Sequence, residues 1–208
     1  MNEKQSNVGF SRRDFVKAVA TTAVVASATN IIGSAQAAEG GQPVEFMSKG
    51  LRCKGLKFVP ADLKAGDKRP CIVLAHGFSA VKEMYFTDYA QAFANAGFVA
   101  IAFDYRFQGE SEGEPRGQIF PWEQIEDFRN AITFAQTQAD VNPDKIGVFG
   151  SSYSGGHVIC LGALDRRIKA VACQVPLVDG WTNFQAIVPR AAGAGMIKYL
   201  ESDRIERF

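Results

Sequence analysis

The sequence lacks an excess of either charge. Its 208 residues include 23 Lys and Arg against 22 Asp and Glu, which gives a formal net charge of +1. Proteins that bind nucleic acid or an anionic membrane electrostatically carry a basic surplus, so this balance points to neither kind of partner. The remaining composition, 47% hydrophobic and 22% charged residues, is typical of a soluble globular domain.

Cysteine and histidine are also scarce. The four cysteines, Cys53, Cys71, Cys160 and Cys173, are too widely spaced for a metal cluster. Cys71 and Cys173 fall in predicted strands and Cys160 on a predicted helix, which favours buried free thiols, although an oxidising compartment would permit a disulfide. No metal or organic cofactor is implied. Only two histidines are present, so a catalytic base has few candidates.

A long apolar run is missing as well, even at the N-terminus. Residues 11–17 contain the pair Arg12 and Arg13, a mildly apolar stretch follows, and residues 35–37 read Ala-Gln-Ala, a small-x-small cleavage site. The stretch carries too many Ser, Thr and Asn residues for a stable membrane span. We therefore expect residues 1–37 to be a signal peptide that directs the protein through the twin-arginine export machinery to the periplasm or the exterior.

Predicted strands and helices alternate through the next part of the chain, residues 38–176. The pattern of apolar residues and turn signals predicts strands at residues 44–48, 51–59, 71–75, 98–103, 146–150 and 167–175, and helices at 86–96, from Pro121 onward and at 157–164. Such alternation predicts an α/β fold, a mostly parallel sheet with crossover helices.

The most informative segment is 146–157, which reads Ile-Gly-Val-Phe-Gly-Ser-Ser-Tyr-Ser-Gly-Gly-His. A strand, a turn of small residues and a helix in this order are typical of a nucleophile elbow, which lifts a serine hydroxyl above the sheet edge. In the G-x-S-x-G frame Gly150 takes the first position, Ser152 is the nucleophile, and Ser154 replaces the second glycine. Ser154 as nucleophile would push the turn into the helix. A Gly/Ser-rich helix cap is the alternative.

From Val44 to Pro176 the chain resembles the dienelactone hydrolase-like branch of the α/β-hydrolase superfamily, including relatives similar to acetyl-ester hydrolases and X-prolyl dipeptidyl peptidases. The motifs that carry the resemblance are residues 76–78 (His-Gly-Phe), 103–106 (Phe-Asp-Tyr-Arg) with Gly109, Ser111 and Gly113, the elbow at 150–156, and residues 165–171. Family members often have Gly where this chain has Phe107, and some have Cys in place of Ser152.

The resemblance implies a serine hydrolase. Ser152 would attack a small acyl ester, while the backbone N–H groups of Phe78 and Tyr153 would form the oxyanion hole. Peptides and lactones stay open as substrates of the same fold. The acidic residues between Asp104 and Gly113 are expected to solvate a surface loop, with Asp104 and Arg106 bracing the strand end.

The catalytic histidine and the acid are not found in this pattern. The fold places its triad in the order Ser, Asp or Glu, His, and His157 alone follows Ser152, inside a helix that leads away from it. His76 is expected to be a structural hydrogen-bonding residue, and Asp179 is a candidate acid only in a minority of architectures. Residues 177–208 read as a helical segment, the start of a cap, without the last strands.

Two interpretations follow from these missing groups. The first is that the chain is the N-terminal part of a longer hydrolase, with the base and the acid elsewhere. The second is a non-catalytic binding protein or pseudoenzyme that keeps the fold and the elbow. The oligomeric state is not indicated by the sequence.

The export signal makes a direct prediction. Expression of the chain in a bacterium with a working twin-arginine pathway should yield an exported protein that begins near Ala38, because cleavage follows the Ala-Gln-Ala site. Mass spectrometry of the exported protein checks the new N-terminus. An exported protein with an intact N-terminus would contradict cleavage.

Overall fold

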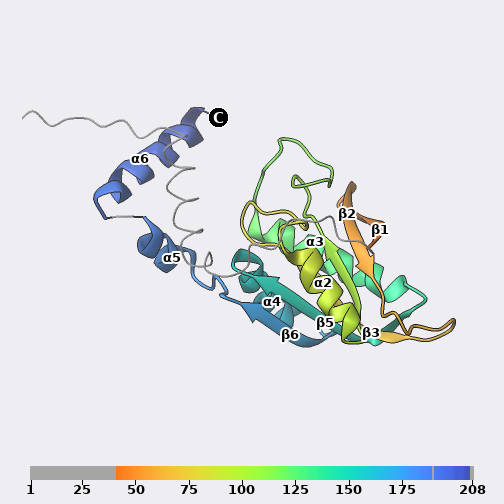
Figure 1. Ribbon diagram of the computed structural model, residues 1–208. Coiled ribbons are helices and arrows are strands. Elements are labelled where there is room, and N and C mark those ends of the chain that lie inside the picture. The colour runs from red at the N-terminus through yellow and green to blue at the C-terminus, as the bar shows by residue number, and fades with distance from the viewer. Residues whose placement is uncertain (1–40, 189, 207–208) are drawn as a thin grey trace, which may run out of the picture. The chain divides into compact units, whose positions relative to one another are not determined.

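The computed structural model of the protein describes residues 41–188 and 190–206 (Figure 1). They divide into two compact units, one that ends at Val178 and one that begins at Asp179. The predicted signal peptide at residues 1–37 lies outside the described ranges. None of the helices within those ranges has the length and apolar character that crossing a bilayer requires.

The first unit is built on one six-stranded sheet. Its order is β1-β2-β4-β3-β5-β6, where β1 and β2 form an antiparallel hairpin, β2 pairs antiparallel with β4, and the other pairs are parallel. The strands are β1 (Gln42–Ser48), β2 (Leu51–Phe58), β3 (Arg69–Ala75), β4 (Val99–Phe103), β5 (Val141–Ser151) and β6 (Ile168–Gln174). This topology confirms the predicted α/β fold with a mostly parallel sheet.

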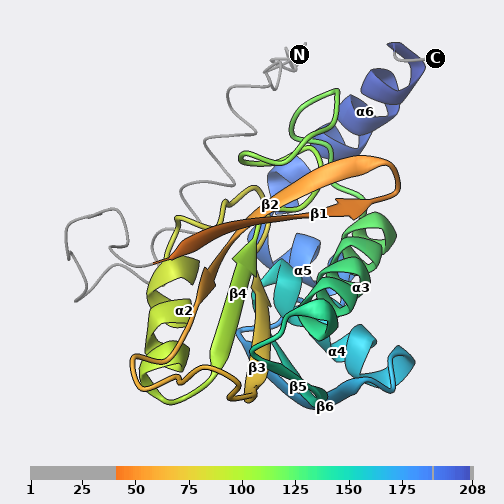
Figure 2. The same cartoon turned by 90° about the vertical axis from the view of Figure 1, so that its right-hand side faces the viewer.

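Helices cover both faces of this sheet. α2 (Phe86–Asn95) packs on one face, and α3 (Pro121–Thr137) and α4 (Tyr153–Leu164) pack on the other (Figure 2). The central strand β4 is buried throughout: Ile101 belongs to the core under α3 and α4, while Ala100 and Ala102 belong to the core under α2. Successive side chains of a strand point to opposite faces, so a continuous apolar run is needed in such a doubly covered strand.

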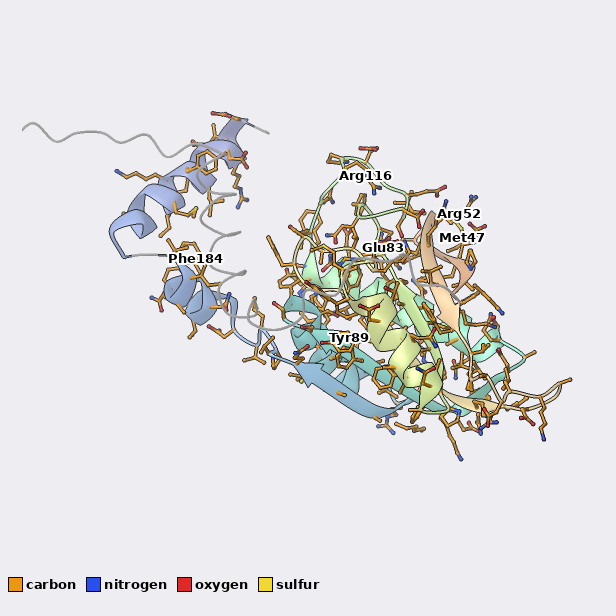
Figure 3. The ribbon with its side chains drawn as sticks, in the orientation of Figure 1. Met47, Arg52, Glu83, Tyr89, Arg116 and Phe184 are labelled. Atoms are coloured by element: carbon orange, nitrogen blue, oxygen red, sulfur yellow. The ribbon has the colours of Figure 1, made fainter. Side chains whose placement is uncertain are left out.

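The described part of the second unit consists of two helices. These are α5 (Gly180–Ile187) and α6 (Arg190–Glu206). Asp179 is the N-cap of α5, where its carboxylate accepts a hydrogen bond from the Thr182 N–H. Phe184, labelled in Figure 3, stacks on Trp181 with ring centroids 5.6 Å apart. The predicted helical segment is therefore helical in its described part.

The largest differences from the predicted boundaries are the starts of α4 and β5. α4 begins at Tyr153, four residues before the predicted start, because the turn at Ser152 leads straight into the helix. β5 begins at Val141 because Val141 already pairs with Arg69. The register then shifts, so that Ile146 pairs with Cys71.

The prediction of buried thiols was correct in part. All four cysteines are free; Cys53 and Cys71 are buried, Cys160 is half-buried and Cys173 is exposed. Cys173 is exposed because β6 is an edge strand of this sheet, and the residues from 169 to 174 are all open to solvent.

Phe128 tests the packing between α3 and the sheet. Its side chain is fully buried and meets Phe103 edge-on with ring centroids 5.3 Å apart. Phe128→Ala should lower the free energy of unfolding by about 3–5 kcal/mol, because the change leaves a cavity. Urea unfolding followed by circular dichroism measures it. Trp122→Ala, at an exposed position of the same helix, should change it by no more than about 0.5 kcal/mol; equal losses would contradict this account of the core.

Candidate active site

Ser152 lies in the sharp turn between β5 and α4. Its backbone angles are φ 56° and ψ −116°, a combination that a residue other than glycine rarely adopts. The turn is possible only with small neighbours: a Cβ at Gly150 would lie 2.4 Å from the Ser154 carbonyl oxygen. Strained backbone of this kind costs about 1–3 kcal/mol and is concentrated at functional sites. This is the geometry of a nucleophile elbow.

The loop after β3 passes directly beside this turn. A Cβ at Gly77 would lie 3.2 Å from the Ser152 Cβ and 3.1 Å from the Ser151 carbonyl oxygen, so glycine permits the approach. Phe78 follows Gly77, and its ring meets the Tyr153 ring edge-on at 5.7 Å between centroids. The two residues predicted to form the oxyanion hole therefore lie together on either side of the turn.

The backbone N–H groups of Phe78 and Tyr153 are the donors of the predicted oxyanion hole. Tyr153 is the first residue of α4, where the helix offers no carbonyl partner to the N–H. Within residues 41–188 and 190–206, neither the Tyr153 N–H nor the Phe78 N–H donates a hydrogen bond. Two such donors, together with the positive end of a helix dipole, suit a developing oxyanion.

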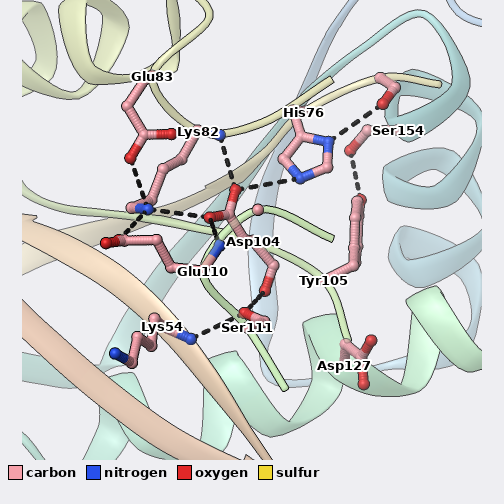
Figure 4. A network of polar contacts seen from close by, with 12 residues as sticks. Lys54, His76, Lys82, Glu83, Asp104, Tyr105, Glu110, Ser111, Asp127 and Ser154 are labelled. Atoms are coloured by element: carbon pink, nitrogen blue, oxygen red, sulfur yellow. Dashed lines mark hydrogen bonds and ion pairs between the residues drawn. The ribbon is translucent and has the colours of Figure 1, made fainter. Parts of the chain in front are cut away.

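An ionic network holds the loop after β3 (Figure 4). Asp104, with no exposed surface, accepts hydrogen bonds from the Lys82 N–H at 2.7 Å and from Lys82 Nζ at 2.9 Å. Its Oδ1 lies 3.4 Å from Nε2 of His76, which is equally buried. Asp104 thus ties both ends of the segment from residue 76 to 82 to the end of β4.

The charges of this network stabilise one another. Burial alone would raise the pKa of Asp104, but the contacts with His76 and Lys82 outweigh it and hold the pKa below its ordinary value. Burial likewise acts to lower the pKa of Lys82, yet hydrogen bonds with Glu110, Glu83 and Asp104 raise it.

The carboxylates of Glu83, Asp104 and Glu110 are close enough to hold a cation. The Lys82 ammonium already contacts all three, so this group does not fit a metal ion.

The acidic loop was therefore predicted correctly in one respect and wrongly in another. Asp104 and Arg106 do brace the strand end: Arg106 Nε donates to Asp127 Oδ1 at 2.5 Å. Asp104 is not a solvating residue of a surface loop, because Lys82 brings a compensating charge into the interior.

A second polar contact lies under the first turn of α4. The Tyr105 hydroxyl, fully buried, donates to the Ser154 Oγ at 2.9 Å. The Tyr105 ring also meets His76 edge-on at 5.0 Å between centroids. The Ser154 side chain is therefore buried and hydrogen-bonded, whereas Ser152 is exposed.

Both histidines are engaged away from Ser152. His157 Nε2 lies 2.9 Å from Gln124 Oε1, and its ring packs against Tyr153. His76 Nδ1 lies 3.1 Å from the Gly77 carbonyl oxygen. In the described part of the chain, no hydrogen bond joins the Ser152 hydroxyl to a histidine. That neither histidine is the base stays a prediction.

Several residues that build the site were not predicted from the sequence. Lys82 gave no signal, because a lysine between predicted elements is ordinary. Tyr105 follows the carboxyl end of β4. Gln174, whose carbonyl oxygen accepts a hydrogen bond from the Ser152 N–H at 2.9 Å, is the last residue of β6. The rule that ligand sites form where parallel strands end could have drawn attention to them.

The fold places the chain among the α/β-hydrolases. The crystal structure of the alpha/beta hydrolase GrgF from Penicillium sp. sh18 matches it with a TM-score of 0.66 at 26% identity, over 80% of this chain and 54% of that one. More narrowly, the chain belongs to the X-Pro dipeptidyl-peptidase (S15) family, whose sequence profile matches residues 50–198.

Curated relatives share the same region. The quorum-quenching protein AidA of Acinetobacter baumannii is 35% identical over 146 residues, which are 70% of this chain and 47% of that protein. The thiohydrolase aneE of Aspergillus aculeatus is 37% identical over 148 residues, again 70% of this chain and 44% of the relative. This chain spans about half the length of the curated relatives that it matches.

His157 should make the stability depend on pH. Burial lowers the pKa of His157 from 6.5 to about 4. Between these values the unfolded chain binds a proton that the folded protein does not, so the free energy of unfolding falls as the pH falls from about 6.5 to 4, by up to roughly 3 kcal/mol. Urea unfolding at pH 7 and pH 4.5 measures the change.

His157→Gln is the matched control, since it removes this titration and leaves the other groups in place. The variant should lose less stability than the wild type between the two pH values. Equal losses in the two proteins would show that His157 is not held neutral by burial.

Proposed function

We propose that this chain carries the nucleophile and the oxyanion hole of a serine hydrolase that cleaves small carboxylic esters. The observation that carries the proposal is the strained Ser152 turn with the N–H groups of Phe78 and Tyr153 beside it, which donate no hydrogen bond within the described part of the chain. Membership of a hydrolase family supports the same class of reaction.

The reaction would proceed in two steps. The Ser152 Oγ attacks the acyl carbonyl and its proton passes to a base, while the Phe78 and Tyr153 N–H groups hold the oxyanion. The alcohol leaves with a proton, and water then hydrolyses the acyl-enzyme and regenerates the serine. No residue in this mechanism calls for a metal or an organic cofactor.

The base in this proposal is a histidine other than His76 and His157. His157 pairs with Gln124, and His76 lies in the interior beside Asp104. Either a further part of a longer protein or a second chain would supply the histidine and its acid. Loss of a triad member from a serine hydrolase leaves about 10³–10⁴ of rate enhancement over water, so this chain alone would be a slow catalyst.

The proposed substrates are small acyl esters. Two other acyl classes are near in chemistry, because one relative is named a thiohydrolase and the family name refers to a peptidase. Thioesters, peptides and lactones all offer a carbonyl to the same serine and oxyanion hole. A binding protein of the same fold is the second candidate, favoured by the engagement of both histidines.

We also propose that the protein works outside the cytoplasm. The support is the Arg12-Arg13 pair and the Ala-Gln-Ala site at residues 35–37. The proposed partners are the twin-arginine export machinery and a small acyl substrate, and no nucleic acid.

Labelling with a fluorophosphonate probe tests the nucleophile. The wild type should be labelled slowly and should hydrolyse p-nitrophenyl acetate slowly, because the oxyanion hole and substrate binding act without the base. Ser152→Ala should lose both activities. Ser151→Ala is the matched control at the neighbouring position and should keep both. Circular dichroism confirms folding of each protein. A folded wild type that stays unlabelled would favour the binding protein.

A further inference from the structure

The backbone of Ser152 is hydrogen-bonded on both sides to the last residue of β6 and the residues that follow it. The Ser152 N–H donates to the Gln174 carbonyl oxygen at 2.9 Å. The Ser152 carbonyl oxygen accepts from the Leu177 N–H at 2.8 Å. Residues 174–177 therefore close a hydrogen-bonded clamp around the residue with the strained backbone, and we call them the clamp segment.

The fit between the clamp segment and α4 depends on two glycines. A Cβ at Gly155 would lie 2.9 Å from the Pro176 Cα, and a Cβ at Gly156 would lie 2.1 Å from the Leu177 carbonyl oxygen. Contacts this close to backbone atoms leave no room for a side chain. The glycines that follow the elbow thus serve the approach of the clamp segment as well as the turn.

The clamp segment is itself anchored and strained. The Tyr89 hydroxyl of α2, labelled in Figure 3, donates to Gln174 Oε1 at 3.0 Å. Val175 has φ 41°, which is a rare conformation for a β-branched residue. Such a conformation persists only where the surrounding bonds impose it.

We propose that the clamp segment is a positioning element that fixes the direction of the Ser152 hydroxyl relative to the Phe78 and Tyr153 N–H groups. This inference rests on the proposed function, since it assigns a role in presenting the nucleophile. Without the bond from Leu177, the Ser152 carbonyl is held less firmly and the turn can relax toward an ordinary conformation. The serine would remain present but would react more slowly.

Removal of the Leu177 N–H tests the clamp. Leu177→Pro lacks the donor, whereas Leu177→Ala keeps it and loses only side-chain contacts. In the full chain, the maximal rate of fluorophosphonate labelling (kinact) should be about tenfold lower in Leu177→Pro than in Leu177→Ala. The apparent probe affinity (KI) should be the same in both. Equal kinact values in two folded variants would overturn the proposal.

A second pair of variants guards against misfolding of the proline variant. Gly155→Ala forces a Cβ against Pro176 of the clamp segment. Gly162→Ala, in the same helix, meets only the end of the Val171 side chain at 2.7 Å. Gly155→Ala should lower kinact, while Gly162→Ala should label as the wild type does. The opposite order would overturn the proposal.

Hydrogen exchange tests the clamp segment independently of the proposed function. If the folded wild type is not labelled, the nucleophile proposal fails, but the two amides can still be measured. The Ser152 and Leu177 amides should both be protected in the wild type, and both should exchange faster in Gly155→Ala. An unprotected Leu177 amide in the folded wild type would overturn the clamp.

Discussion

The backbone conformation of Ser152 is the constraint on which the rest of the site depends. A residue with a side chain at φ 56° must be held there by its surroundings. The chain meets this need with glycines where other backbone segments approach the turn closely, at Gly77, Gly150, Gly155 and Gly156. Ser152 follows β5 at the sheet edge, α4 begins at the next residue, and the loop after β3 passes beside the turn. The family fold is thus arranged to hold one strained turn.

Buried charges hold the loop after β3 in place, as the glycines do for the Ser152 turn. A carboxylate as deeply buried as Asp104 is unfavourable unless it is paired and hydrogen-bonded. Lys82 and His76 supply these contacts from the two ends of the loop that carries Phe78. Gly109 is required as well, since a Cβ there would overlap the Asp104 carboxylate. The network therefore fixes the loop at several points.

The strands, helices and turns could be predicted from the sequence better than the contacts between residues that are distant in it. The apolar run of β4 and the small residues around Ser152 were visible as patterns, because strand periodicity and turn chemistry are local properties. The burial of Asp104 was not, because it depends on Lys82, which lies 22 residues away in the sequence. The backbone hydrogen bonds that join Ser152 to Gln174 and Leu177 were missed for the same reason. Backbone hydrogen bonds between distant segments leave no trace in residue type.

A crystal structure of the fluorophosphonate adduct is the most direct test of the central claim, that Ser152 is a nucleophile presented to two backbone donors. The account predicts phosphorus bonded to the Ser152 Oγ, with the phosphoryl oxygen within about 3.1 Å of the backbone nitrogens of Phe78 and Tyr153. An adduct on another residue would contradict it. So would a phosphoryl oxygen that points away from both nitrogens.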